Sequence, residues 1–257
     1  MSAIDALILA GSRGPHDPVA ALGKVAHKAL TPIAGRPMLA FVLDAVRAVP
    51  EVERLFICID AETDLRPVTN GTPFTRIPPA SSPAASVVAA LEAIDGNRPL
   101  LITTADHPLL TPLMIRCFLD DAPKDADLCV GLAEAETITK AFPDAKRTFY
   151  RLAGKGYSGC NLFLARKPGA ARVAAYWRRM ESHRKSPLRL VREIGFGALI
   201  RYALGLLDLN AAFRHVSGLT DAQIRPVILP FAEAATDVDK PSDHALVEGI
   251  LKRRTGA

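Results

Sequence analysis

Several features that would define a function are missing from the sequence. The four cysteines form no C-x-x-C pair, and we interpret them as core thiols of a reducing compartment rather than a disulfide framework or zinc site. The six histidines show no paired metal-binding spacing. Aromatic residues make up only 6% of the chain, without a visible stacking platform or recognition motif, which argues against nucleic-acid binding.

Signals for membrane insertion or export are also missing. No uncharged apolar run approaches the roughly 18 residues that a membrane-spanning helix needs. The N-terminal residues M-S-A-I-D-A-L-I-L-A-G contain no basic n-region, so we expect no secretion signal and a cytoplasmic protein. The hydrophobic fraction of 49% over 257 residues is ample for a packed core. No stretch is typical of a flexible linker, and we therefore predict a single domain over residues 1–257.

The net charge of +5 is concentrated in one segment. Residues 172–201 hold eight Lys or Arg and two Glu, a net +6, which leaves −1 for the rest of the chain. These cations are mixed with large apolar residues such as Trp177 and Phe196. One interpretation is a pair of amphipathic helices with a solvated basic face. The other is that residues 172–207 contact an anionic membrane surface or a lipid-linked phosphorylated acceptor.

Short apolar runs alternate with runs of helical period in the first half of the chain, which predicts an α/β fold. A mainly parallel sheet covered by helices on both faces, in three layers, accounts for this order. Strands are expected at 6–10, 54–60, 99–104 and 127–132, with helices at 37–49, 84–94 and 112–120 and a loop at 69–83.

The second half is more elaborate. We expect an irregular charged stretch at 135–148, strands at 149–152, 160–165 and 226–229, and helices at 170–182, 187–207, 210–216 and 241–252.

The first candidate site is the loop that follows the first expected strand, in I-D-A-L-I-L-A-G-S-R-G. In an open α/β sheet, ligands bind just beyond the carboxyl ends of the strands. Gly11 and Gly14 allow backbone N–H groups to approach an anion, and Arg13, Lys24 and Lys28 add positive charge. The loop therefore indicates a polyphosphate site, although a turn with solvated cations would look similar.

Acidic residues form the second candidate site. Asp106 follows six uncharged residues and precedes His107, which we expect to be structural. A buried carboxylate at this place usually has a metal or cation beside it, although Asp106 could also cap a turn. Asp237 and Asp239 precede the last expected helix, and Asp239 could be merely its N-terminal cap. Paired with Asp106, however, it could share one Mg²⁺, which prefers oxygen ligands and also takes substrate phosphates.

Four segments in order resemble the landmarks of a known family. They read L-I-L-A-G-S-R-G, H-K-A-L-T-P-I-A-G-R-P-M-L, T-T-A-D-H-P-L-L and D-V-D-K-P-S-D. Together they resemble the MobA-like nucleotidyltransferases, which are related to the sugar-nucleotide pyrophosphorylases. The resemblance implies a Rossmann-like three-layer αβα sandwich. Residues 1–132 would then form the nucleotide-binding half and residues 133–257 the acceptor-binding half, with a basic amphipathic helical segment at 170–217.

The resemblance also implies a reaction and its residues. An NMP group would pass from CTP, GTP or UTP to a phosphorylated small molecule, with Mg²⁺ as cofactor and release of pyrophosphate. Lys28, Arg13 and Asp106 would be catalytic, and Asp106 and Asp239 would bind the metal. The acceptor would lie near Gly159 and Asn161. The nucleotide-binding residues would be Leu9, Ala10, Gly11, Ser12, Arg13, Gly14, Lys28, Ser82 and Ser86.

Two positions depart from the family pattern. Ser12 stands where relatives usually have glycine, and His16 stands where a reactive-loop arginine is expected. Arg13 or Lys24 could supply that charge. Without such a charge the protein could be a non-catalytic nucleotide-binding protein. A nucleotide-sugar-dependent glycosyltransferase of the related fold is a second alternative. The glycosyltransferases usually carry a D-x-D motif at the position of Asp106, where this chain reads A-D-H-P, which favours nucleotidyl transfer.

Overall fold

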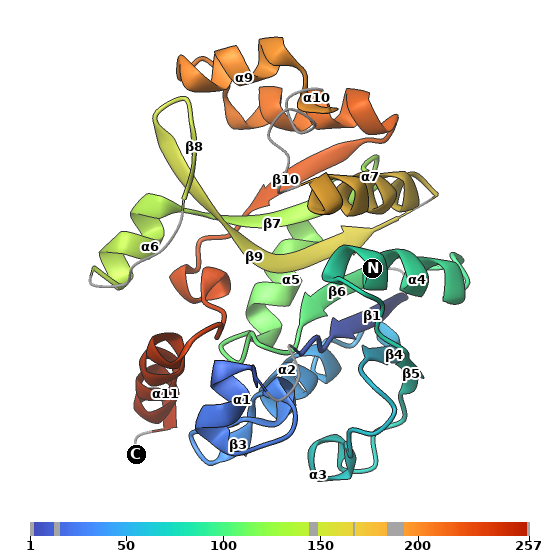
Figure 1. Ribbon diagram of the computed structural model, residues 1–257, viewed down its shortest axis with the longest axis vertical. Helices are drawn as coiled ribbons and strands as arrows, with labels where there is room; N and C mark the ends of the chain where they lie inside the picture. Colours follow the sequence, from blue (N-terminus) through green and yellow to red (C-terminus); the bar gives the residue numbers. More distant parts are fainter. Residues whose placement is uncertain (1–2, 13–15, 144–148, 167, 184–192, 256–257) are drawn as a thin grey trace.

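The computed structural model describes residues 3–12, 16–143, 149–166, 168–183 and 193–255, which form a mixed sheet between two layers of helices (Figure 1). The strand order is β10-β7-β9-β6-β1-β4-β5, with β8 paired to the outer part of β9. The strands of this sheet are β1 (Ile4–Leu9), β4 (Val52–Cys58), β5 (Thr75–Ile77), β6 (Leu100–Thr104), β7 (Leu128–Glu134), β8 (Tyr150–Leu152), β9 (Lys155–Ala165) and β10 (Ile224–Ile228).

The remaining elements are a two-stranded hairpin and the helices. The hairpin pairs β2 (Pro32–Ile33) with β3 (Arg36–Pro37). The helices are α1 (Pro18–Gly23), η2 (Lys28–Leu30), α2 (Met38–Arg47), α3 (Arg66–Thr69), α4 (Pro83–Ala93), α5 (Pro112–Asp121), α6 (Ala135–Ala141), α7 (Gly169–His183), α9 (Phe196–Ala203), α10 (Leu209–Thr220), η3 (Ala232–Ala235) and α11 (Pro241–Thr255).

The central strand β1 is buried on both faces, which explains its uninterrupted apolar sequence. Ala6 and Ile8 pack in the core that includes α2 and Phe118 of α5. Leu7 points to the opposite face, where it packs in the core that includes α4 and Ala174 of α7. Because neighbouring strand residues alternate between faces, both helical layers are anchored by this one strand. The predicted α/β sandwich with a mainly parallel sheet is therefore confirmed.

The strand pairing brings distant segments to one edge of the sheet. β1 lies parallel to both β4 and β6, so the carboxyl ends of these three strands coincide. β9 runs antiparallel between β6 and β7. Ile102 of β6 pairs with Phe163 of β9, and the same register continued for two residues brings Asn161 to the end of β6. Val130 of β7 pairs with Phe163 of β9, but Leu132, two residues further along β7, pairs with Gly159, which is four residues from Phe163. Asn161 thus lies in a β-bulge, a feature that redirects side chains near functional sites.

Several local expectations were wrong. No helix was expected between β1 and Lys28, but this stretch contains α1, where the Asp17 carboxylate caps the helix by accepting from Val19 and Ala20 N–H. This helix is too short to give a periodic pattern. Residues 135–148 are not irregular throughout, since α6 begins the stretch and residues 144–148 lie outside the described part. The expected loop at 69–83 contains strand β5, which pairs with β4.

The basic segment also differs from its prediction. A single helix over 187–207 is replaced by the shorter α9, preceded by Gly195 with φ +89°, a backbone conformation that interrupts a helix and favours glycine. Residues 184–192 lie outside the described part of the chain. The next helix, α10, is capped by Asp208, and it continues beyond its expected end at residue 216 to Thr220.

The described helices include none that is both long and apolar enough to cross a membrane.

Two positions of α5 should differ in how much they contribute to stability. Phe118 is fully buried and Leu113 is 53% exposed. Phe118→Ala should lower the free energy of unfolding by about 3–5 kcal/mol, because a large cavity is left in the core. Leu113→Ala, on the same helix, should change it by less than about 0.5 kcal/mol. Urea unfolding of both variants measures the two free energies. A similar loss in both would contradict the placement of Phe118 in the core and of Leu113 at the surface.

Candidate active site

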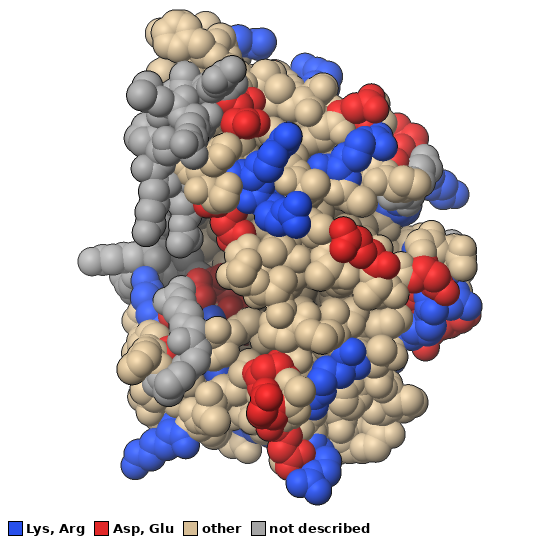
Figure 2. Space-filling view, turned by 45° about the vertical axis from the view of Figure 1, so that its right-hand side comes forward, with Lys and Arg blue, Asp and Glu red and all other residues tan. Residues whose placement is uncertain are grey.

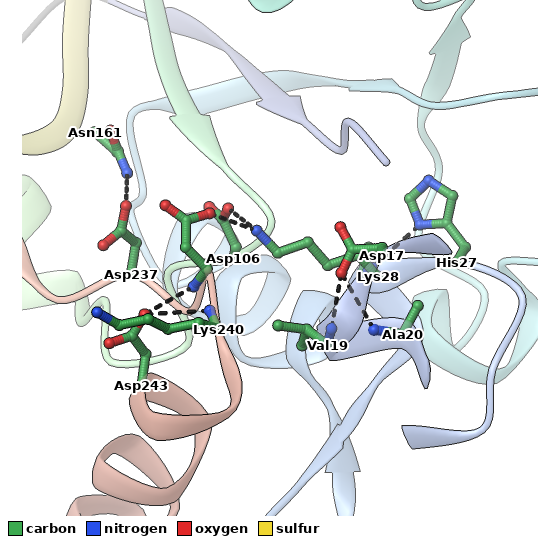
Figure 3. A network of polar contacts seen from close by, with 12 residues as sticks. Asp17, Val19, Ala20, His27, Lys28, Asp106, Asn161, Asp237, Lys240 and Asp243 are labelled. Carbon is green, nitrogen blue, oxygen red and sulfur yellow. Dashed lines mark hydrogen bonds and ion pairs between the residues drawn. The ribbon is translucent and has the colours of Figure 1, made fainter. Parts of the chain in front are cut away.

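Three charged residues from distant parts of the chain meet at the carboxyl edge of the sheet (Figure 3). The Lys28 ammonium Nζ lies 2.7 Å from Asp106 Oδ2 and 2.9 Å from Asp239 Oδ1. Lys28 comes from η2, Asp106 from the turn after β6, and Asp239 from the segment before α11. These are charge-assisted hydrogen bonds of normal length. The structure therefore brings together the predicted lysine and both predicted metal ligands.

Lys28 is held in place by the residue before it. His27 Nδ1 accepts a hydrogen bond from the Ala29 N–H at 3.1 Å and so caps η2. Its Nε2 lies 3.4 Å from Asp60 Oδ2. Lys28 itself is buried, and burial alone would lower its pKa, but the charges and hydrogen bonds of Asp106 and Asp239 raise that pKa above its ordinary value. Lys28 is thus a fixed positive charge.

Asp106 is positioned by the end of β6 and in turn positions the C-terminal segment. Its backbone carbonyl accepts a hydrogen bond from the Val238 N–H at 2.9 Å. This bond holds Asp239 beside the end of β6. The second carboxylate oxygen of Asp106, Oδ1, is buried and has no hydrogen-bond partner among the residues that the structure describes. A buried oxygen in this state is unusual and leaves one coordination position of Asp106 available.

The Asp239 carboxylate contacts Lys28, so it is more than a helix cap. The Asp243 carboxylate, in the first turn of α11, accepts from the backbone N–H groups of Asp239 and Lys240, both at 3.2 Å. These two bonds tie the segment that carries Asp239 to the start of α11. Helix α11 is fixed by an apolar cluster in which its Val247 packs with Val19 of α1. The position of Asp239 therefore depends on this C-terminal helix.

Asn161 reaches the same site from β9. Its side-chain Nδ2 donates a hydrogen bond to Asp237 Oδ2 at 3.3 Å, and Figure 3 shows this pair beside Asp106. Asn161 has φ +49°, a left-handed conformation that asparagine tolerates better than most residues. Gly159 is exposed, and a Cβ there would meet no described atom within 4 Å. Packing therefore does not require glycine at that position, and the acceptor role of both residues stays a prediction.

The loop after β1, predicted to bind phosphate, is described only in part. Leu9 O accepts from the Ala105 N–H and the Ala10 N–H donates to Cys58 O, both at 2.9 Å, so these two residues continue the sheet. Gly11 and Ser12 are exposed beyond it. Arg13 and Gly14, both predicted to bind nucleotide, lie outside the described residues.

Two further cations or potential cations flank this loop. Both His16 and Lys24 are exposed. Lys24 ends α1 with φ +51°.

The two serines predicted to lie near the base both bind backbone. Ser82 Oγ caps α4 by accepting from the Ala85 N–H at 3.2 Å. Ser86 Oγ accepts from the Ala80 N–H at 2.9 Å. Both hydroxyls therefore shape the loop before α4, and their contact with a nucleotide base stays a prediction.

The carboxylates of the site determine whether it suits a magnesium ion. Among the described residues no group of three or more His, Cys, Asp or Glu is arranged to hold a metal. Mg²⁺ often needs only one or two carboxylates, because substrate phosphates and water complete its coordination. Asp106 and Asp239 converge on one cation, the Lys28 ammonium, and Asp106 Oδ1 is unpartnered within the described residues. This donor set fits Mg²⁺ bound together with a nucleotide.

His107 is buried behind the site. Its Nε2 lies 3.3 Å from the Glu233 carbonyl oxygen, and burial lowers its pKa to about 4. His107 is therefore neutral near pH 7 and packs the turn that carries Asp106.

Sequence reasoning missed two residues that position the site. His27 was not distinguished from the other histidines, and Asp60 ends a strand without any motif. The only sequence signal is that His27 directly precedes Lys28.

Comparisons with known proteins identify the class. The sequence profile of the MobA-like NTP transferase domain matches residues 6–194, well over half of the chain. The fold is similar to that of a hypothetical transferase from Thermus thermophilus, with 30% sequence identity, a TM-score of 0.80, and 94% of this chain and 99% of the other covered. No curated protein sequence matches the chain.

Two more distant structures share the fold. The 4-diphosphocytidyl-2C-methyl-D-erythritol synthase from Anaerococcus prevotii has 12% identity and a TM-score of 0.61, with 98% of this chain and 99% of that chain covered. A CMP:2-keto-3-deoxy-manno-octonic acid synthetase in complex with CTP has 13% identity and a TM-score of 0.56, with 99% and 100% covered.

The fold and the profile match define a nucleotidyltransferase with a Rossmann-like sandwich. The chain belongs to the MobA-like NTP transferase family. Of the three functions that the sequence left open, this result selects nucleotidyl transfer.

His27 predicts a pH dependence. Burial lowers its pKa below 6.5, with Asp60 and Asp17 opposing this effect, and only the neutral ring can accept at Nδ1 from the Ala29 N–H. The unfolded chain takes up the proton first as the pH falls, so this contribution to stability is complete above about pH 6.5 and is lost below it. Asparagine can cap the helix without titrating in this range. Between about pH 7 and pH 5, the unfolding free energy of His27→Asn should therefore fall less than that of the wild type.

His27→Ala is the matched control, because it removes the cap altogether. It should lower stability by about 1 kcal/mol near neutral pH. An unchanged pH profile in His27→Asn would show that the histidine does not titrate as proposed.

Proposed function

We propose that this protein is a Mg²⁺-dependent nucleotidyltransferase that transfers NMP from an NTP to a phosphorylated small-molecule acceptor and releases pyrophosphate. The observation that carries the proposal is the convergence of Asp106 and Asp239 on the Lys28 ammonium. Family membership supplies the general reaction. The metal, the acceptor class and the role of each residue are the parts proposed here.

The triphosphate would lie between the loop after β1 and the carboxylate pair. Asp106 and Asp239 would hold a Mg²⁺ ion, which would neutralise and orient the triphosphate when bound. The Lys28 ammonium already lies within 2.9 Å of both carboxylates. It would therefore contact phosphate oxygens at the same place and stabilise the charge that develops around the α-phosphorus.

The transfer itself needs little from the protein beyond positioning. An ionised oxygen of the acceptor phosphate forms a bond to the α-phosphorus. The bond from the α-phosphorus to the bridging oxygen of the leaving group breaks, and pyrophosphate departs with that oxygen. Since the acceptor phosphate is already ionised near neutral pH, no general base is required. The buried, neutral His107 is consistent with this, because it contacts a backbone carbonyl and serves the fold.

The acceptor would approach from the side of β9. Asn161 presents a side-chain amide beside Asp106, at a bulge that turns this residue toward the site. An amide both donates and accepts hydrogen bonds, which suits hydroxyl and phosphate groups of a small acceptor. The exposed Gly159 would leave space for the acceptor next to Asn161.

Asp106→Asn should separate catalysis from stability. The substitution keeps the shape of the side chain but removes one of the charges that hold the metal and Lys28. We expect turnover to fall by at least about 10²-fold, with a change in unfolding free energy of no more than about 1 kcal/mol. Pyrophosphate release from each of four NTPs, with Mg²⁺ or with EDTA and a panel of phosphorylated acceptors, measures turnover.

The control for this variant is Asp44→Asn, which changes an exposed carboxylate that contacts Arg36 away from the site. It should keep full activity. Near-normal turnover in Asp106→Asn, or activity that survives EDTA, would refute the proposed metal site.

Asn161→Gly tests the acceptor side. Glycine adopts φ +49° without strain, so the variant removes the amide while sparing the backbone that the bulge needs. We expect the KM for the acceptor to rise about tenfold, the loss of one good hydrogen bond, with thermal stabilisation by NTP unchanged. Asn161→Ala is the companion variant and should be less stable, because alanine disfavours this conformation. A larger effect on NTP binding than on the acceptor would place Asn161 in the nucleotide site instead.

A further inference from the structure

Lys28 lies between Asp106 and Asp239, at the place where an ion shared by the two carboxylates would bind. Its ammonium nitrogen is 2.7 Å from an oxygen of Asp106 and 2.9 Å from an oxygen of Asp239 (Figure 3). The two oxygens that face this nitrogen are the ones that would face a common Mg²⁺. A magnesium ion binds oxygen at about 2.0–2.1 Å, so the ion and the ammonium cannot share this place.

The second carboxylate oxygen of Asp106 gives an ion no separate entrance. Oδ1 is buried and has no hydrogen-bond partner among the residues that the structure describes, whereas Oδ2 contacts Lys28. The Asp239 side chain is 53% exposed, against 21% for that of Asp106. An ion that arrives from solvent therefore reaches Asp239 first, and it meets Asp106 on the side that Lys28 holds.

The charge of Lys28 also opposes the binding of a free divalent ion. Two ionised carboxylates carry two negative charges, and the ammonium cancels one of them. Burial acts against the charged form of Lys28, but Asp106 and Asp239 raise its pKa above the ordinary value, so it stays charged near neutral pH. Repulsion between cations a few ångströms apart is strong where water is partly excluded. Free Mg²⁺ must therefore displace a cation that is already well paired.

A bound nucleotide removes this obstacle. Triphosphate oxygens offer the Lys28 ammonium a new partner of opposite charge, and they supply further oxygen ligands to the metal. The lysine side chain is a flexible four-carbon stem, while His27 holds the backbone of η2 through the Ala29 N–H. The ammonium can therefore move from the carboxylates to phosphate while the main chain stays in place.

We infer that Lys28 blocks the magnesium site of the free protein, so that metal binds together with the NTP and not before it. The inference rests on the proposed function and adds the order in which its ligands bind. Coupling of this kind is reciprocal, so bound Mg²⁺ also strengthens the binding of the nucleotide. Lys28 thus replaces the metal in the free protein and contacts phosphate in the loaded one.

Binding of Mn²⁺, which carboxylate ligands also suit, tests the inference without catalysis. Loss of the hydrated Mn²⁺ signal in electron paramagnetic resonance measures binding to the full-length protein without nucleotide. Lys28→Met should bind Mn²⁺ at least about tenfold more tightly than the wild type, because its two carboxylates lack a countercharge. Mn²⁺ should also raise the melting temperature of Lys28→Met and leave that of the wild type close to its value in EDTA.

Two further variants serve as controls. Lys252→Met removes a lysine that contacts Glu248 on α11, and it should bind Mn²⁺ as weakly as the wild type. Exposed carboxylates, drawn in red in Figure 2, are common to these proteins, so weak binding at the surface cancels in the comparison. Lys28→Met combined with Asp106→Asn should lose the tight binding, which assigns that binding to the site.

The wild type alone keeps the inference falsifiable if Lys28→Met does not fold. A clear rise in the melting temperature of the nucleotide-free wild type with Mn²⁺ would overturn the inference. A folded Lys28→Met that binds Mn²⁺ no more tightly than the wild type would overturn it too. In both cases, wild-type turnover that still requires Mg²⁺ leaves the proposed function intact. Turnover that survives EDTA would instead refute the metal site, and the inference with it.

Discussion

The attraction between one ammonium group and two carboxylates links three segments of the chain at the active site. The Asp106 carboxylate, largely buried at the end of β6, and the buried Lys28 ammonium would each be unfavourable without a countercharge. Lys28 supplies that charge for both Asp106 and Asp239, at distances below 3 Å. The price of desolvating these groups is offset by hydrogen bonds of good geometry and by packing around η2 and α11. The proposed metal would act at the same place, where the protein already stabilises a cation.

The fold places these groups through strand order rather than through sequence proximity. Parallel pairing of β1 with β4 and β6 sets the loop after β1, Asp60 and Asp106 at the same edge of the sheet. The antiparallel strand β9 enters beside β6 and adds Asn161 from the other half of the chain. Two halves that differ in sequence character therefore contribute to one candidate site, and the proposed division gives the nucleotide to the first and the acceptor to the second.

The sequence predicted the sandwich and the main charged residues because these leave strong local signals. Buried parallel strands read as continuous apolar runs, and an aspartate at the end of such a run is conspicuous, as Asp106 is. The role of Asp239 could not be assigned in the same way. In sequence it is an acceptable cap for α11, and only the geometry shows its contact with Lys28, 211 residues away. The β-bulge at Asn161 and the pairing of His27 with Asp60 depend on long-range register, which leaves no local pattern.

The length of chain between the partners has a consequence for biosynthesis. Lys28 and Asp239 are 211 residues apart, and Asp239 precedes α11, the last helix that the structure describes. Contacts between such distant residues form late, after most of the loop-closure entropy has been overcome. Lys28 is therefore synthesised long before Asp239, and the acidic pair around its ammonium can be complete only after the segment before α11 has joined the sheet.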